Sequence, residues 1–167
     1  MTVKVRRFLA ALINILLLLL FFVIRYSGIA VLNIGQATPL ILLPLALSIS
    51  IFFGENAGLI AGFFTGAFMD SVSSESSCFN TIFMVVCCMV GGLLSSRFFN
   101  KNLKAAACLS VSAAFAYFVL KYLIFFAFQG ISVDYSYFTL YLIPSAVYTS
   151  VWIIPFYFLN KKLSDRA

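Results

Sequence analysis

The stretch Gly58-Leu-Ile-Ala-Gly62-Phe-Phe-Thr-Gly66-Ala-Phe-Met-Asp70 places three glycines and one carboxylate at four-residue intervals. Residues four apart lie near one face of a helix, drifting by about 40° per step. In lipid, glycines at this spacing remove side-chain bulk from one stripe, so another helix backbone can approach closely. A carboxylate at the end of that stripe is costly against hydrocarbon and normally faces protein or water. The stretch therefore predicts a closely packed helix that places one acidic group at a protein interface.

The composition of the whole chain indicates a membrane protein. Of its 167 residues, 63% are hydrophobic and 10% are charged, and the mean hydropathy is +1.10. Histidine is absent and the four cysteines form no Cys-x-x-Cys pair, so neither a metal nor a cofactor is expected. The net charge of +6 comes from basic residues clustered at segment ends, without the continuous basic face that nucleic-acid binding requires.

Six apolar segments predict an all-α, polytopic membrane protein with its helices in one bundle, forming a single membrane domain over residues 1–167. A bilayer core about 30 Å thick needs about 20 residues of helix. The predicted spans are residues 8–24, 36–53, 56–73, 78–95, 105–128 and 137–159. The four prolines fall in or at the edges of these spans. A bundle tolerates them because neighbouring helices satisfy the carbonyl groups that proline leaves free.

The distribution of Lys and Arg predicts the orientation. These residues gather in the N-terminal tail, in residues 97–104 and in residues 161–166, whereas the opposite side carries only Arg25. By the positive-inside rule both termini are cytoplasmic, in agreement with six crossings. A cleaved signal peptide is the alternative for the first segment. Its uncharged run of 17 residues, Phe8–Ile24, exceeds the usual length of about 7–15, so a retained anchor is predicted.

The third segment decides where the acidic group lies. Only 14 uncharged residues separate Glu55 from Asp70, which is about 21 Å of helix and too short to cross a bilayer. We therefore expect the helix to continue through Asp70. A buried carboxylate needs a partner, and we predict an ion pair with Lys121 or with Arg25. The alternative for Lys121 is snorkelling to the headgroups, and for the glycines it is packing within this chain.

A motif around the aspartate carries a resemblance to a known family. Between residues 39 and 104, a proline-containing apolar segment and a tight turn at residues 54–56 precede Gly62-Phe63-x-x-Gly66-x-x-x-Asp70. A short polar loop then leads to Cys78-Phe79-Asn80. This pattern resembles the rod shape-determining protein MreD family of bacteria, which typically has glycine where this chain has Cys78.

The resemblance implies a non-enzymatic scaffold of the cell-elongation machinery, which governs cell shape and wall synthesis, in the bacterial cytoplasmic membrane. The implied partners are an MreC-like membrane protein, MreB filaments, RodA and a class B penicillin-binding protein, besides the lipid bilayer itself. It also implies that the region from Gly62 to Asp70 shapes either the bundle or a docking surface for MreC. The candidate helix-packing residues are Gly58, Gly62, Gly66, Asp70 and Asn80.

Two other functional classes remain open at this point. One is the substrate-binding subunit of an energy-coupling-factor vitamin transporter, which also has six helices. Its cavity would be lined by Ser73, Glu75, Asn80, Asp134 and Tyr135, with Tyr137, Tyr141, Tyr148 and Trp152 as stacking surfaces. The other is an intramembrane aspartyl enzyme, which needs two converging carboxylates, whereas only Asp70 is predicted to lie at membrane depth.

Overall fold

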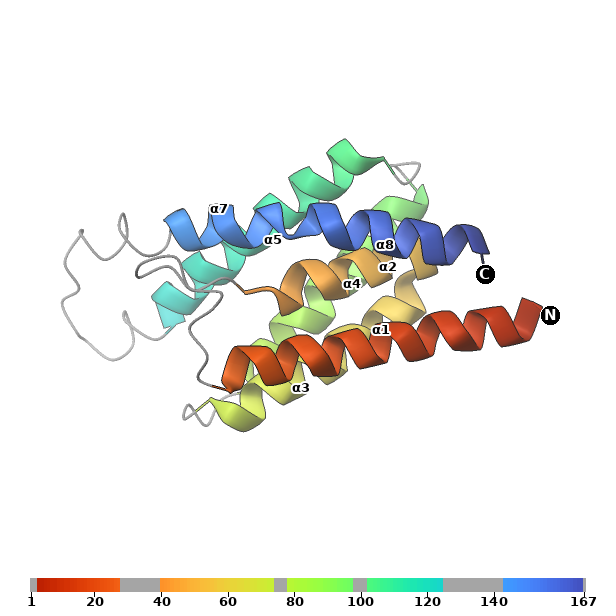
Figure 1. The fold of residues 1–167 in the computed structure, drawn as a ribbon. Helices are drawn as coiled ribbons and strands as arrows, with labels where there is room; N and C mark the ends of the chain where they lie inside the picture. Colours follow the sequence, from red (N-terminus) through yellow and green to blue (C-terminus); the bar gives the residue numbers. More distant parts are fainter. Residues whose placement is uncertain (1–2, 28–39, 74–77, 98–101, 125–142, 167) are drawn as a thin grey trace.

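The computed structural model describes residues 3–27, 40–73, 78–97, 102–124 and 143–166, and the regular elements within these ranges are helices. Figure 1 shows them as a bundle whose two termini lie at the same end. The helices are α1 (Val3–Tyr26), α2 (Leu42–Phe53), α3 (Glu55–Val72), α4 (Phe79–Arg97), α5 (Leu103–Tyr122), α7 (Ile143–Val151) and α8 (Ile153–Arg166).

The two ends of the bundle carry different features. At one end α1 and α3 finish and α4 begins, and we call this the Asp70 end. At the other end lie the turn between α2 and α3 and both chain termini, and we call this the Gly54 end. Because α3 runs as one helix from Glu55 to Val72, the prediction that it continues through Asp70 is confirmed.

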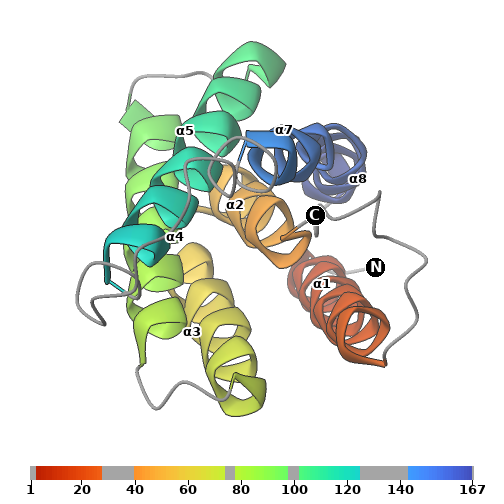
Figure 2. The same cartoon turned by 90° about the vertical axis from the view of Figure 1, so that its left-hand side faces the viewer.

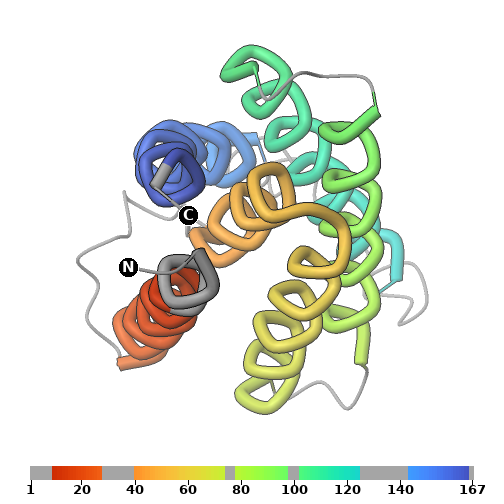
Figure 3. Tube along the Cα trace, turned by 90° about the vertical axis from the view of Figure 1, so that its right-hand side faces the viewer, coloured from red at the N-terminus to blue at the C-terminus, as the bar shows by residue number. Residues whose placement is uncertain are grey.

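Helix α2 forms the centre of the bundle. Figures 2 and 3 show it surrounded by the other helices when the molecule is viewed from either end. Residues Leu42 to Phe52 are all buried, because this helix is apolar around its whole circumference. Polar groups connect it to its neighbours: Asn160 Nδ2 of α8 donates to Ser48 Oγ at 2.7 Å, and Leu40 N, two residues before α2 begins, donates to Thr149 Oγ1 of α7 at 2.9 Å.

The turn between α2 and α3 depends on one glycine. Gly54 has φ +89°, a backbone conformation that residues with a Cβ rarely adopt. It lies between Phe53, the last residue of α2, and Glu55, the first residue of α3. This single residue reverses the chain, so that α3 packs beside α2 from its first turn onward. The tight turn predicted at residues 54–56 is confirmed.

Most of the predicted sixth span, residues 137–159, falls within the described residues, whereas its part before residue 143 lies outside them. Residues 143–166 form two helices, α7 and α8, separated at Trp152. Proline at position 155 lacks the N–H that would bond to the carbonyl of Val151, and its ring clashes with that carbonyl, so the helix breaks there. The described prolines 44, 144 and 155 all lie in the first turn of their helices, where a missing N–H costs little.

Large apolar side chains cover much of the outer surface of the bundle. Examples are Leu16 of α1 at 60% exposed, Ile60 of α3 at 61%, Ile82 of α4 at 64% and Val147 of α7 at 61%. Within the described ranges, three helices are long and apolar enough to cross a membrane: α1, over residues 9–26, α4 and α5. An outer surface this apolar is suited to hydrocarbon, while α2 supplies the core.

Candidate functional site: the contact between α3 and α4

The three glycines of α3 all face α4. A Cβ at Gly62 would lie 2.7 Å from Met84 O, and one at Gly66 would lie 2.3 Å from Thr81 Cα. Both atoms belong to the backbone of α4, so neither can move aside without shifting the helix. A Cβ at Gly58 would lie 3.0 Å from Cys88 O. The stripe therefore lets two antiparallel backbones approach closely, and its face is occupied within this chain.

Helix α4 contributes small residues of its own at the Gly54 end. A Cβ at Gly92 would lie 2.8 Å from the Cα of Glu55, in the first turn of α3. Ser50 of α2 reaches the same place, where its hydroxyl donates to the carbonyl oxygen of Cys88. Gly58 and Gly92 both lie against that serine side chain. Three helices thus meet around Ser50.

Asp70 closes the glycine stripe at the opposite end by capping α4. Its Oδ1 accepts hydrogen bonds from Asn80 N at 3.2 Å and Asn80 Nδ2 at 2.8 Å. Its Oδ2 accepts from Thr81 N at 2.8 Å and from the Thr81 hydroxyl. These backbone N–H groups are the second and third of α4, which an N-cap side chain normally satisfies. We call this set of contacts the Asp70 cap.

The sequence explains why the cap comes from another helix. The residue before α4 is Cys78, whose thiol is a weak acceptor and a poor N-cap. Gly66 places α3 so close to Thr81 that Asp70, one turn later, reaches the free N–H groups of α4. A carboxylate is also favoured at the positive end of a helix dipole. The glycine stripe and the acidic group therefore act together.

A third helix joins the Asp70 cap through Asn80. This residue is 4% exposed, and its Oδ1 accepts a hydrogen bond from the Tyr117 hydroxyl of α5 at 2.7 Å. The Tyr117 ring packs edge-on against Phe83 of α4, with 5.2 Å between centroids. Asn80 thus has partners on α3 and α5, so the cap connects three helices at one point.

Removing the Tyr117 hydroxyl is expected to weaken this connection. In Tyr117→Phe, the buried Oδ1 of Asn80 loses its donor while the ring packing remains. We expect a loss of about 1–2 kcal/mol in the free energy of unfolding, measured by SDS titration of the purified protein in mixed micelles. Tyr148→Phe on α7 is the matched control, because that hydroxyl makes no hydrogen bond with a described residue. Equal effects of the two substitutions would contradict the assigned role of Tyr117.

The two predicted cationic partners of Asp70 lie at the same end of the bundle. Arg25, in the last turn of α1, and Lys121, in the last turn of α5, line a cavity of about 100 Å³ together with Ser73 and Asn80. The hydrogen bonds that the carboxylate accepts in the described part of the chain come from α4. The ion pairs with Lys121 or Arg25 stay predictions. Residues 125–128 of the predicted fifth span lie outside the described residues.

The volume of this cavity can be compared with what the alternative function, vitamin binding by a transporter subunit, requires. Sites for small molecules usually enclose about 300–1,000 Å³, whereas this cavity of about 100 Å³ holds a few waters. Trp152, expected as a stacking surface, packs against Phe21 and Phe156 with centroids 6.0 and 5.9 Å away. The other residues expected to bind a vitamin lie largely outside the described residues: Glu75, Asp134, Tyr135, Tyr137 and Tyr141.

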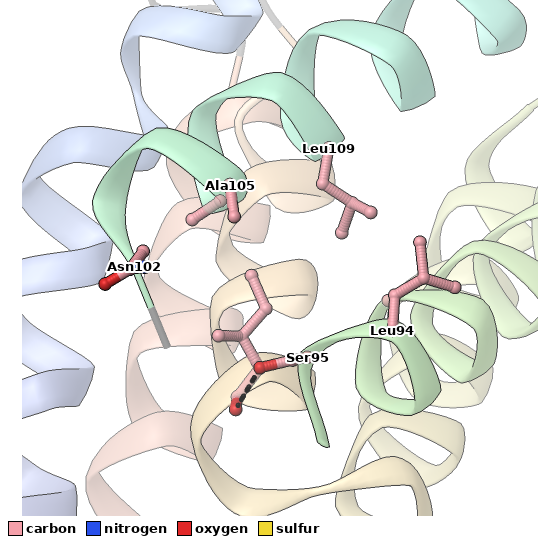
Figure 4. A pocket seen from close by; sticks show the side chains of 8 residues that line it. Leu94, Ser95, Asn102, Ala105 and Leu109 are labelled. Atoms are coloured by element: carbon pink, nitrogen blue, oxygen red, sulfur yellow. Dashed lines mark hydrogen bonds between the residues drawn. The ribbon is translucent and has the colours of Figure 1, made fainter. Parts of the chain in front are cut away.

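A second hollow, at the Gly54 end, is smaller still. Figure 4 shows it between the end of α4 and the start of α5, with Leu94, Ser95, Asn102, Ala105 and Leu109 around it. Its volume is about 10 Å³, enough for one water molecule at most. Ser95 Oγ donates to the carbonyl oxygen of Ile51 at 3.2 Å and so joins α4 to α2 beside it. This hollow is a packing feature.

Several residues of this contact were not predicted. Thr81 was missed because donors to the carboxylate were sought only among cations, and Tyr117 was missed because no partner was sought for Asn80. Gly92 was missed although adjacent glycines, here Gly91 and Gly92, are a packing signal in an apolar segment; Gly91 itself faces Leu47 of α2 and Leu109 of α5. Of the predicted packing residues, Gly58, Gly62, Gly66, Asp70 and Asn80 all lie in the contact between α3 and α4.

The fold and the contact define a class: a membrane protein, helical throughout its described elements, whose helices are held together by backbone packing and a part-buried polar cap. Nearly the whole chain, residues 5–166, matches the family model described as rod shape-determining protein MreD. This chain belongs to the MreD family of cell-shape-determining membrane proteins. Searches of curated proteins and of solved structures found no match.

Proposed function

We propose that this protein is a non-enzymatic scaffold of the bacterial cell-elongation machinery. The observation that carries the proposal is the family match over residues 5–166. The Asp70 cap supports it, because its carboxylate accepts four hydrogen bonds within the fold and is engaged in joining helices. The proposed partners are those of the family: an MreC-like membrane protein, MreB filaments, RodA and a class B penicillin-binding protein.

The proposed topology is six crossings of the cytoplasmic membrane with both termini inside. Two observations support it. The N- and C-termini lie at the same end of the bundle, as an even number of crossings requires. The basic residues Arg97, Lys104, Lys161 and Lys162 also lie at the Gly54 end, where the positive-inside rule favours the cytoplasm. The Asp70 end then faces outward.

Depletion of the protein from a rod-shaped host tests the proposed function. We expect depleted cells to become round, and the wild-type chain to restore rods. Asp165→Ala, which changes an exposed carboxylate near the C-terminus, should restore them equally well. Gly66→Leu should fail, because its side chain would overlap the α4 backbone. Depleted cells that keep their shape and their rate of wall synthesis would contradict the proposal.

A further inference from the structure

An apolar groove lies between α1 and α3, over the flank of α2. Its volume is about 340 Å³, and it is lined by residues 11–19 of α1, by Ile49 and Phe53 of α2, and by residues 57–68 of α3. Figures 2 and 3 show α1 and α3 standing apart on the same side of α2. The rings of Phe22 and Phe68, 5.1 Å apart, bring α1 and α3 together toward the Asp70 end. We call this feature the α1–α3 groove.

One polar side chain, Asn14, lines the α1–α3 groove, and its oxygen has no hydrogen-bond partner among the described residues. Asn14 is 4% exposed, and its Nδ2 donates to Ala10 O of its own helix at 3.1 Å. Its Oδ1 is buried and accepts no hydrogen bond from any residue that the structure describes. An unpaired carbonyl oxygen in an apolar setting is costly, so its position points to a donor outside the described helices.

The chemistry of the groove excludes most occupants. A lipid acyl chain fits an apolar groove but has no donor for Asn14 Oδ1. A water molecule has a donor but occupies only about 30 Å³ of the volume. A second copy of the chain, in a symmetric dimer with this groove on its axis, would present the same concave surface and leave the groove unfilled. A transmembrane helix with a polar side chain has both the shape and the donor.

We propose that the α1–α3 groove receives a transmembrane helix of a different protein, and that a Ser, Thr, Asn or Gln side chain of that helix donates to Asn14 Oδ1. Ala57 and Ala61, four residues apart on α3, both line the groove and allow a helix backbone to approach closely. This inference rests on the proposed scaffold function and adds to it the place and the chemistry of one partner contact.

Photo-crosslinking in native membranes tests the proposal. The probe p-benzoylphenylalanine replaces Ile60, which lines the groove and is 61% exposed, and as a control Ile82 of α4, which is 64% exposed and outside the groove. From position 60 we expect a crosslink to one transmembrane segment of another protein, which peptide sequencing shows to contain Ser, Thr, Asn or Gln. Crosslinks from position 60 only to lipid, to a second copy of this chain, or to a segment without such a residue would overturn the proposal.

A second variant separates docking from folding. Asn14→Leu has a similar volume but removes the acceptor, so we expect it to lower the crosslink yield from position 60 about threefold to tenfold. The melting temperature of the purified chain should stay the same or rise, because an unpaired polar group is lost. An unchanged yield, or a fall in melting temperature of several degrees, would overturn the role given to Asn14.

The two proposals fail in different ways. If depleted cells become round but the groove crosslinks only lipid, the scaffold function stands and the docking site is wrong. If the groove crosslinks a polar transmembrane helix but depleted cells keep their shape, the docking site stands and the scaffold function is wrong.

Discussion

Asp70→Ala is expected to lower the free energy of unfolding by about 3 kcal/mol. The substitution removes both oxygens that satisfy Asn80 N, Asn80 Nδ2, Thr81 N and the Thr81 hydroxyl. Loss of an N-cap alone costs about 0.5–2 kcal/mol, and buried donors left unpaired add about 1–3 kcal/mol. SDS titration in mixed micelles measures the loss, and cell shape reports its consequence.

The control for this prediction is Asp165→Ala, since Asp165 is exposed and far from the cap. Substitutions at such exposed positions usually change the free energy of unfolding by no more than about 0.5 kcal/mol. If Asp70→Ala behaved like the control, the carboxylate would not be holding the start of α4. In that case Asp70 would contribute no more to stability than an exposed carboxylate does.

Gly66→Ala is expected to destabilise the protein by about 2 kcal/mol, which is opposite in sign to the helix propensity of alanine. In a free helix, alanine is favoured over glycine by about 1 kcal/mol. In this contact the new Cβ would lie 2.3 Å from Thr81 Cα, so the two helix backbones must separate. Their separation also moves Asp70 away from the N–H groups that it caps. The measurement is again unfolding by SDS.

Val86→Ile provides the matched control for the glycine. It also adds one methyl group, at a position of α4 that is 53% exposed. We expect little change in stability from it. A stabilising effect of Gly66→Ala would show that propensity outweighs packing, which would contradict the close approach of α3 and α4.

The order of the helices could be predicted from the sequence because apolar length and charge carry that information. The ranges predicted for the third and fourth segments, 56–73 and 78–95, differ from α3 and α4 by one or two residues at each end. The glycine stripe indicated a face for close packing, and that face lies against α4. The crossing count and the orientation remain proposals that rest on the charge pattern.

The partner of the acidic group could not be predicted in the same way. Sequence reasoning sought an opposite charge for Asp70, whereas the donors are largely backbone N–H groups, which every residue has and no sequence pattern marks. The one available signal was Cys78, a poor N-cap residue standing directly before an apolar helix. A helix start without a cap of its own indicates that a side chain from elsewhere satisfies it.

The unpaired oxygen of Asn14 could not be predicted from the sequence either. An asparagine in the first apolar segment reads as an ordinary intrahelical donor, and its Nδ2 does donate to Ala10 O. Only the fold shows that Asn14 lines a groove between two helices and that its Oδ1 is buried without a partner among the described residues. Whether a polar atom finds a partner depends on contacts between helices that are distant in the sequence. A single sequence does not reveal these contacts.

The most direct test of the account is a double-mutant cycle between Asp70→Ala and Thr81→Val. The central claim is that the carboxylate of α3 caps the first turn of α4, and Thr81→Val removes one hydroxyl donor to it while keeping the side-chain shape. We predict that the sum of the free-energy losses of the two single variants exceeds the loss of the double variant by about 1 kcal/mol. Losses that add to within about 0.3 kcal/mol would show that the two groups do not interact and would contradict the claim.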